Sequence, residues 1–119
     1  MTLLEAAAAL RAKRVSSSEL VSASLARIAA LDERLNSFIT VTGDSARREA
    51  ERADRELAGD IDRGPLHGIP IALKDVFCTK GVRTTCGSKI FADHVPARDA
   101  AVVKKLTAAG AVLIGKTNM

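Results

Sequence analysis

The sequence predicts an α/β fold, and three observations lead to that prediction. Apolar residues recur at helical spacing through the first sixty residues, while two short apolar runs stand at 69–73 and 111–114 with another helical pattern between them. Strand, crossover helix and strand form a βαβ unit, in which the two strands are parallel. We therefore expect residues 1–60 to be mostly helical and residues 61–119 to be arranged as strand, loop, helix and strand.

The first two helices should each begin at a capping box, in which a hydroxyl residue precedes a glutamate by three positions. Thr2 and Glu5 open a short helix that we expect to end near Ala12, and Ser16 and Glu19 open a longer one. Spacings of three, four and seven give the longer helix one apolar stripe, which consists of Val21, Leu25, Ile28 and Leu35.

A short strand and a third helix complete the first sixty residues. Residues 37–42 carry apolar side chains typical of a strand, and Asp44 or Ser45 should cap a helix that ends at Gly59. The inward face of this helix is made of small residues, and its other faces carry arginine and glutamate four residues apart, as in Arg52 with Glu56. Such pairs are typical of a solvated helix surface.

The most informative stretch runs from Gly64 to Asp75 and reads Gly-Pro-Leu-His-Gly-Ile-Pro-Ile-Ala-Leu-Lys-Asp. Its apolar run at 69–73 predicts a buried strand that stops at Lys74. An ammonium at the end of a buried strand is costly unless it is paired or neutral, and a desolvated lysine releases its proton more easily. Lys74 is therefore a candidate base or nucleophile. The alternative is a lysine that leaves the core and reaches solvent where the strand ends.

The remaining residues read as a long loop, a helix and a strand. Residues 77–98 have no regular pattern, and long irregular loops in compact domains are often functional. Asp99 should cap the following helix, which Gly110 closes, and its apolar stripe should be Val102, Leu106 and Ala109. Parallel strands need cover on both faces, which these helices do not supply in full. We expect the first part of a larger domain, whose open strand faces and edges favour aggregation.

Composition limits the possible functions. The 119 residues carry a mixed net charge of +4, with three Phe and no Trp or Tyr, so a nucleic-acid surface built on aromatic stacking is poorly supported. Neither the cysteines nor the histidines fit a metal-ligand spacing, and we read the histidines as loop residues. Two reduced thiols favour a cytoplasmic protein, and no apolar run is long enough to span a membrane.

One apparent nucleotide-binding motif should be rejected as a coincidental match. Gly110 to Thr117 reads Gly-Ala-Val-Leu-Ile-Gly-Lys-Thr and satisfies the pattern of a phosphate-binding loop. That pattern works as a flexible loop between a strand and a helix N-terminus. Here the four intervening residues are the strand itself, Gly110 stands where a helix ends, and no helix follows. We therefore expect no nucleotide site at Lys116.

The stretch from Gly64 to Asp75 resembles the lysine-bearing segment of the amidase signature family. Further similar segments are 78–90, which reads Cys-Thr-Lys-Gly-Val-Arg-Thr-Thr-Cys-Gly-Ser-Lys-Ile, then Val95-Pro96, Asp99-Ala100, and 108–119, which ends in Gly-Lys-Thr-Asn-Met. Within the family, these segments are most similar to the group formed by the A subunits of the glutamyl-tRNA(Gln)/aspartyl-tRNA(Asn) amidotransferases. That group often has asparagine where this chain has Val76.

The resemblance implies a fold and a mechanism. The fold is a mixed sheet flanked by helices, of which this chain would be the incomplete N-terminal part. The mechanism uses a Ser–cis-Ser–Lys triad, and the lysine carries over to Lys74, acting as base through the middle serine. Both serines would lie downstream of Thr117-Asn118-Met119, so we expect this piece alone to be inactive. Ser88 matches no catalytic position.

The resemblance also implies a substrate and partners. Glutamine would be the amide donor, and its ammonia would pass to the B subunit of the amidotransferase, which activates charged tRNA with ATP and Mg²⁺. The expected partners are therefore the B and C subunits and, through the complex, tRNA, with no cofactor held by this chain. Two alternatives stay open, a stand-alone hydrolase of small amides from the same family and a truncated fragment without catalytic function.

Overall fold

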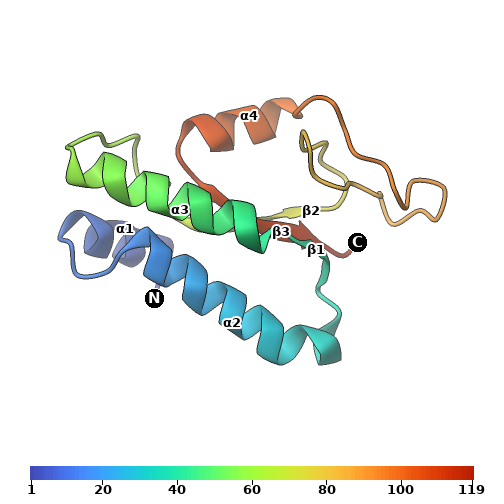
Figure 1. Ribbon diagram of the computed structural model, residues 1–119, viewed down its shortest axis with the longest axis horizontal. Coiled ribbons are helices and arrows are strands. Elements are labelled where there is room, and N and C mark those ends of the chain that lie inside the picture. Colours follow the sequence, from blue (N-terminus) through green and yellow to red (C-terminus); the bar gives the residue numbers. More distant parts are fainter.

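The computed structural model describes residues 1–119 as four helices and one three-stranded sheet (Figure 1). The elements in order are α1 (Leu3–Arg11), α2 (Ser17–Leu35), β1 (Phe38–Val41), α3 (Gly43–Ala58), β2 (Pro70–Lys74), α4 (Ala101–Ala108) and β3 (Val112–Thr117). The strand order is β1-β3-β2, with β3 antiparallel to β1 and parallel to β2. The predicted α/β fold, its mixed sheet and its βαβ unit are thereby confirmed.

The two predicted capping boxes are present. Thr2 accepts a hydrogen bond from the backbone N–H of Glu5, whose carboxylate accepts one from the backbone N–H of Thr2. Ser16 and Glu19 make the same reciprocal pair at the start of α2. Each box satisfies two backbone groups that a helix end would otherwise leave without a partner, which fixes where α1 and α2 begin.

The main core lies where α2 and α3 pack against β3. Its buried side chains are Val21, Leu25, Ala46, Ala50, Val112 and Ile114. The alanines of α3 are small, so that helix can approach the strand closely. The predicted stripe of α2 is correct up to Ile28, which packs against this core, and wrong at Leu35, which is 65% exposed. Leu35 is the last residue of α2 and lies past the packed part of the helix.

Two predicted helix caps are wrong. The N-cap of α3 is Thr42, whose hydroxyl donates to the carbonyl of Leu113 on β3 and so ties the helix start to the sheet. The N-cap of α4 is Ala100, which makes no side-chain cap. Asp99 instead accepts a hydrogen bond from the backbone N–H of Lys80, so its carboxylate holds the long loop. At α4 a tertiary contact thus takes the side chain that the local pattern assigns to the helix. At α3 the predicted caps make local contacts instead, because Ser45 donates to the carbonyl of Thr42 and Asp44 pairs with Arg47.

The buried face of α4 also differs from the predicted one. Val103 is 3% exposed, whereas Val102, which the sequence places on the apolar stripe, is 42% exposed. Figure 1 shows α4 on the opposite side of the sheet from α2. A cavity of about 360 Å³ remains between α4 and the sheet, and its apolar lining includes Leu73, Val103 and Leu113. This face of the sheet is therefore covered only in part.

The three strands differ in their burial. β3 is central and buried along most of its length, so the expectation that the apolar run at 111–114 would be exposed is wrong. β2 is an edge strand in which Leu73 is buried while Ala72 and Lys74 are exposed, so the expected burial of this strand is only partly correct. Its free edge has no fourth strand to pair with.

A bulge in β3 decides which way its last residues face. Ile71 pairs with Leu113, but the next pair joins Ala72 to Gly115, so Ile114 is an extra residue in β3. An extra residue resets the alternation of side chains across a sheet. Ile114 consequently packs with α2 and α3, whereas Lys116 leaves that apolar face.

None of the four helices combines the length and apolar character needed to cross a bilayer. Apolar side chains are nevertheless exposed in the loop between β2 and α4. The largest are Phe77, Ile90, Phe91 and Val95, which are 39%, 89%, 48% and 54% exposed. Together with the free edge of β2, they favour self-association.

We expect the 119-residue chain to associate as its concentration rises and to bind a fluorescent dye specific for apolar surface. Sedimentation velocity and dye titration measure these two properties. A monomer that melts in one sharp, cooperative transition and binds no dye would contradict the prediction.

Candidate active site at the end of β2

Lys74 is the last residue of β2, and the register places it opposite Thr117 of β3. The carboxyl ends of two parallel strands thus meet here, which is where open α/β sheets bind their ligands. The side chain of Lys74 is exposed, and its ammonium makes no hydrogen bond or ion pair. Its place at the strand end agrees with the sequence-based prediction. Its side chain is not buried as expected, because β2 is an edge strand. Its role as a base stays a prediction.

The backbone that follows Lys74 is tightly fixed. The carbonyl of Lys74 accepts a hydrogen bond of 3.1 Å from the N–H of Phe77, which closes a turn. The N–H of Asp75 donates to Thr117 at 3.0 Å, and the carbonyl of Asp75 accepts from Cys86 at 2.8 Å. The turn is therefore held on one side by β3 and on the other by the long loop.

A buried ion pair lies beside this turn. The side chains of Asp75 and Lys116 are both 0% exposed, and Asp75 Oδ1 lies 4.0 Å from Lys116 Nζ. The ammonium of Lys116 donates to the carbonyl of Phe77 at 2.8 Å and to the hydroxyl of Thr84 at 2.7 Å. Thr85 donates to Asp75 Oδ2 through both its backbone N–H and its hydroxyl. Oδ1 of Asp75 has no hydrogen-bond donor.

Burial and the neighbouring charges have opposite effects on the pKa of Lys116. Burial lowers the pKa of Lys116 below its ordinary value, and the nearby Asp75 carboxylate, with Cys78 and Cys86, acts in the opposite direction. A buried lysine that keeps its charge needs a carboxylate or several acceptors close by. Lys116 has both, which explains how it remains in the interior.

The sequence pattern indicates Lys74 but not its buried neighbours. Thr84, Thr85 and Lys116 belong to segments that resemble the family, yet no motif assigns them a part in the site. One signal was available, because Lys74-Asp75 and Lys116 place three charges at the ends of two adjacent parallel strands. The sequence did not reveal the bulge at Ile114, which turns Lys116 toward Asp75.

The serines occupy structural positions. Ser88 lies in a turn of the long loop, where its hydroxyl accepts a hydrogen bond from the N–H of Ile90, in agreement with its reading as a loop residue. Ser16 caps α2, and Ser17 donates to the carbonyl of Gly68 just before β2. No hydrogen bond joins the ammonium of Lys74 to a serine hydroxyl among these 119 residues.

The backbone conformation from Gly110 to Thr117 supports the rejection of the nucleotide-binding motif. Gly110 follows the end of α4 with a positive φ of 82°, and Val112–Thr117 is strand rather than a flexible loop. The ammonium of Lys116, which a phosphate would need, already donates to Phe77 and Thr84 inside the protein.

We predict that calorimetric titration of the folded chain with ATP and Mg²⁺ shows no micromolar binding, because the backbone N–H groups and the lysine are already engaged. Binding that disappears in Lys116→Ala and persists in Lys104→Ala, a substitution on the exposed face of α4, would contradict this reading.

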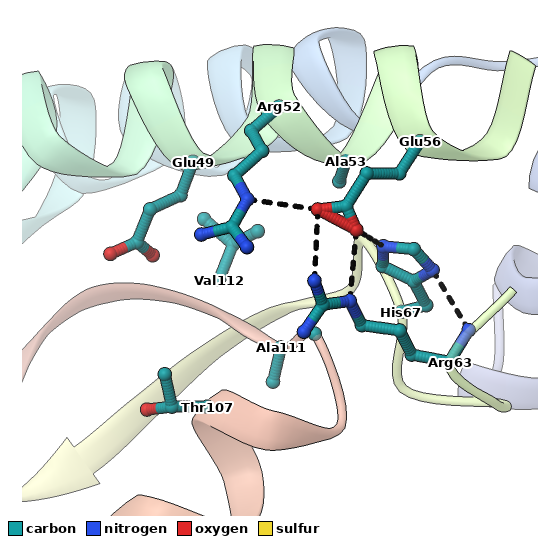
Figure 2. Close-up of a pocket in the computed structure, with 10 residues that line it drawn as sticks. Glu49, Arg52, Ala53, Glu56, Arg63, His67, Thr107, Ala111 and Val112 are labelled. Carbon is teal, nitrogen blue, oxygen red and sulfur yellow. Dashed lines mark hydrogen bonds and ion pairs between the residues drawn. The ribbon is translucent and has the colours of Figure 1, made fainter. Parts of the chain in front are cut away.

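A second polar cluster surrounds Glu56 of α3, beside a cavity of about 80 Å³ (Figure 2). Its carboxylate accepts hydrogen bonds of 2.8 Å from both Arg52 and Arg63, and His67 Nε2 lies 3.4 Å from it. His67 Nδ1 accepts a hydrogen bond from the backbone N–H of Arg63, so the ring proton is on Nε2, facing Glu56.

This cluster fixes the loop that leads into β2. His67 belongs to the loop, as expected, yet it is 2% exposed. A Cβ added at Gly110 would overlap the ring of His67, so only glycine fits there. The charged groups that bond the carboxylate of Glu56 are the guanidinium groups of Arg52 and Arg63. We therefore assign the cluster a structural role.

Glu56 gives this cluster a pH dependence. Partial burial raises the pKa of Glu56, but hydrogen bonds from Arg63 and Arg52 outweigh it and hold the pKa below the ordinary 4.5. Its contribution to folding stability is then complete above pH 4.5 and is lost as the pH falls through the lower folded-state value.

We predict that NMR titration of the Glu56 carboxyl gives a midpoint below 4.5. Arg63→Gln should raise that midpoint because it removes two of the hydrogen bonds. Arg48→Gln, a substitution on the exposed face of the same helix, should leave it unchanged. Equal midpoints in all three proteins would show that the arginine contact has no influence.

Comparison with known proteins agrees with the resemblance drawn from the sequence. The model of the amidase family matches residues 19–119. The chain belongs to the amidase family. It is 55% identical over 118 residues to the A subunit of the glutamyl-tRNA(Gln) amidotransferase of Methylococcus capsulatus and 57% identical over 120 residues to that of Ectopseudomonas mendocina. These matches cover 99% and 100% of this chain but 24% of each relative.

Solved structures of amidases share the fold. The peptide amidase of Stenotrophomonas maltophilia matches with a TM-score of 0.95 and 40% identity, over 100% of this chain and 25% of that one. An amidase family protein from Bacillus anthracis matches with a TM-score of 0.92 and 32% identity, over 100% of this chain and 24% of that one. The chain thus spans about a quarter of the length of the amidases that it matches.

Proposed function

We propose that this chain supplies the lysine base, Lys74, to an amide-hydrolysing site of the kind found in the A subunits of tRNA-dependent amidotransferases. The observation that carries the proposal is the identity of 50–57% to such subunits over nearly the whole chain. The position of Lys74 supports it, since the lysine stands at the carboxyl ends of parallel strands with its ammonium unpaired. Once it has lost a proton, an unpaired amine is able to accept one.

In the proposed reaction, Lys74 takes a proton through a serine from a second serine, which attacks the amide carbon of glutamine. An acyl-enzyme forms as the proton held by Lys74 passes back through the serine to the amide nitrogen, which leaves as ammonia. Water then hydrolyses the acyl group. Both serines would come from the part of the amidase fold that these residues do not cover. That part would also bury Lys74, which in this chain reaches solvent.

The similarity to these subunits also suggests partners. We propose that the ammonia passes to a B subunit, which amidates charged tRNA with ATP and Mg²⁺, in a complex that includes a C subunit. This chain would hold no cofactor, and the engagement of Lys116 inside the protein is in keeping with that assignment. A stand-alone hydrolase of small amides is the second candidate, because the peptide amidase matches at 40% identity.

The test uses a full-length chain in which residues 1–119 replace the matching quarter of the Methylococcus capsulatus protein. We expect Lys74→Met to lower the kcat of glutamine hydrolysis by about 10²–10⁴-fold, the range that general-base catalysis supplies. Lys104→Met, which removes an exposed lysine of α4, should keep parental activity. An active Lys74→Met protein would refute the assigned base.

The natural full-length protein that contains these residues separates the two candidate functions. Glutaminase activity that depends on addition of the B and C subunits supports the amidotransferase, whereas equal turnover of small amides without them supports the stand-alone hydrolase. The 119 residues alone should hydrolyse neither substrate, because no serine here is bonded to Lys74. Turnover by this chain that Lys74→Ala abolishes would contradict the need for further residues.

A further inference from the structure

The buried pair of Asp75 and Lys116 requires a functional explanation. Both side chains are 0% exposed, and the two charged atoms are 4.0 Å apart. Two of the three N–H groups of the ammonium are used by Phe77 and Thr84, and the carboxylate atom that faces Lys116 has no donor of its own. A buried ion pair contributes little to stability when compared with apolar side chains of similar size. Stability alone therefore does not account for this one.

The pair joins the three segments that surround Lys74. Asp75 directly follows Lys74 in the turn after β2, and Lys116 belongs to β3, opposite Leu73. The ammonium reaches across to the carbonyl of Phe77, the residue whose N–H closes the turn on the carbonyl of Lys74. Thr84 and Thr85 attach the long loop to the same two charges. A change at either charge is thus transmitted to the backbone of Lys74.

We propose that the Asp75–Lys116 pair is a positioning unit for Lys74, which fixes the turn that begins at this lysine and sets the local field in which its ammonium releases a proton. The inference rests on the proposed function of Lys74 as a base. Asp75 and Lys116 are buried behind the site and touch no substrate. They act on the reaction only through Lys74.

In the complete site, the two charges should act on Lys74 in opposite directions. A carboxylate next to an ammonium favours the charged form, and a second ammonium disfavours it. Cys78 and Cys86 are the other titratable groups that influence Lys116, and both are exposed. A base works only when it is unprotonated, so the acid limb of the pH–rate profile reports the net field. Loss of overall stability alone would not move this limb in opposite directions for two substitutions.

The experiment measures kcat and KM for glutamine hydrolysis from about pH 5 to about pH 10 in the full-length chain described above, with Asp75→Asn, Lys116→Met and the double variant. We expect the acid limb to move by about half a pH unit to lower pH in Asp75→Asn and to higher pH in Lys116→Met. The acid limb of the double variant should lie close to that of the parent protein. We expect kcat to fall about tenfold or more in each single variant, with KM changed less than about threefold.

A second set of variants keeps the proposal testable if the charge changes prevent folding, which circular dichroism reveals. Thr84→Val removes an acceptor of Lys116, and Thr85→Val removes a donor to Asp75. Both should lower kcat while leaving KM unchanged. Thr42→Val is the matched control, because its hydroxyl, like that of Thr84, donates to a backbone carbonyl. It lies at the far end of β3, so this variant should keep parental kcat.

Two results would overturn the positioning role. One is a pair of shifts with the same sign, or no shift, in Asp75→Asn and Lys116→Met. The other is equal kcat in Thr84→Val, Thr85→Val and Thr42→Val. The outcome for Lys74→Met separates this inference from the proposed function. If Lys74→Met is inactive while the shifts of the acid limb are absent, only the positioning role is contradicted. An active Lys74→Met protein contradicts the proposed function itself.

Discussion

One carboxylate and one ammonium, kept out of water between two parallel strands and a long loop, hold the end of β2 in place. Asp75 is bound by Thr85 and Cys86, and Lys116 is bound by Phe77 and Thr84. Removing one partner of a buried pair leaves an uncompensated charge, which costs about 3–5 kcal/mol. The conformation of the long loop therefore depends on both residues, although neither stands at the surface where a substrate would bind.

The sheet makes this arrangement possible. Without the extra residue at Ile114, strict alternation would direct Lys116 onto the same face as Val112, among the apolar side chains of α2 and α3. The bulge allows one strand to supply both a buried apolar core on one side and a buried cation on the other. At the opposite end of β2, the cluster around Glu56 and His67 fixes where the strand begins.

The exposed features of the structure lie together around the end of β2. β2 lacks a neighbour on its free edge, Lys74 reaches solvent, and the loop between β2 and α4 exposes Phe77, Ile90 and Phe91. These features belong to β2 and to the loop that directly follows it. Under the proposed function, this surface would meet the residues that complete the catalytic site.

Local structure and family can be predicted from these 119 residues without knowledge of their tertiary contacts. Capping boxes at Thr2 and Ser16 fix the helix starts because they depend on residues three positions apart, and the segment around Lys74 is distinctive enough to identify an amidase. Only the tertiary structure decided the caps of α3 and α4, the exposure of Lys74 and the burial of Lys116. Each of these depends on contacts between residues far apart in the chain, and above all on the register between β2 and β3, which no local pattern encodes.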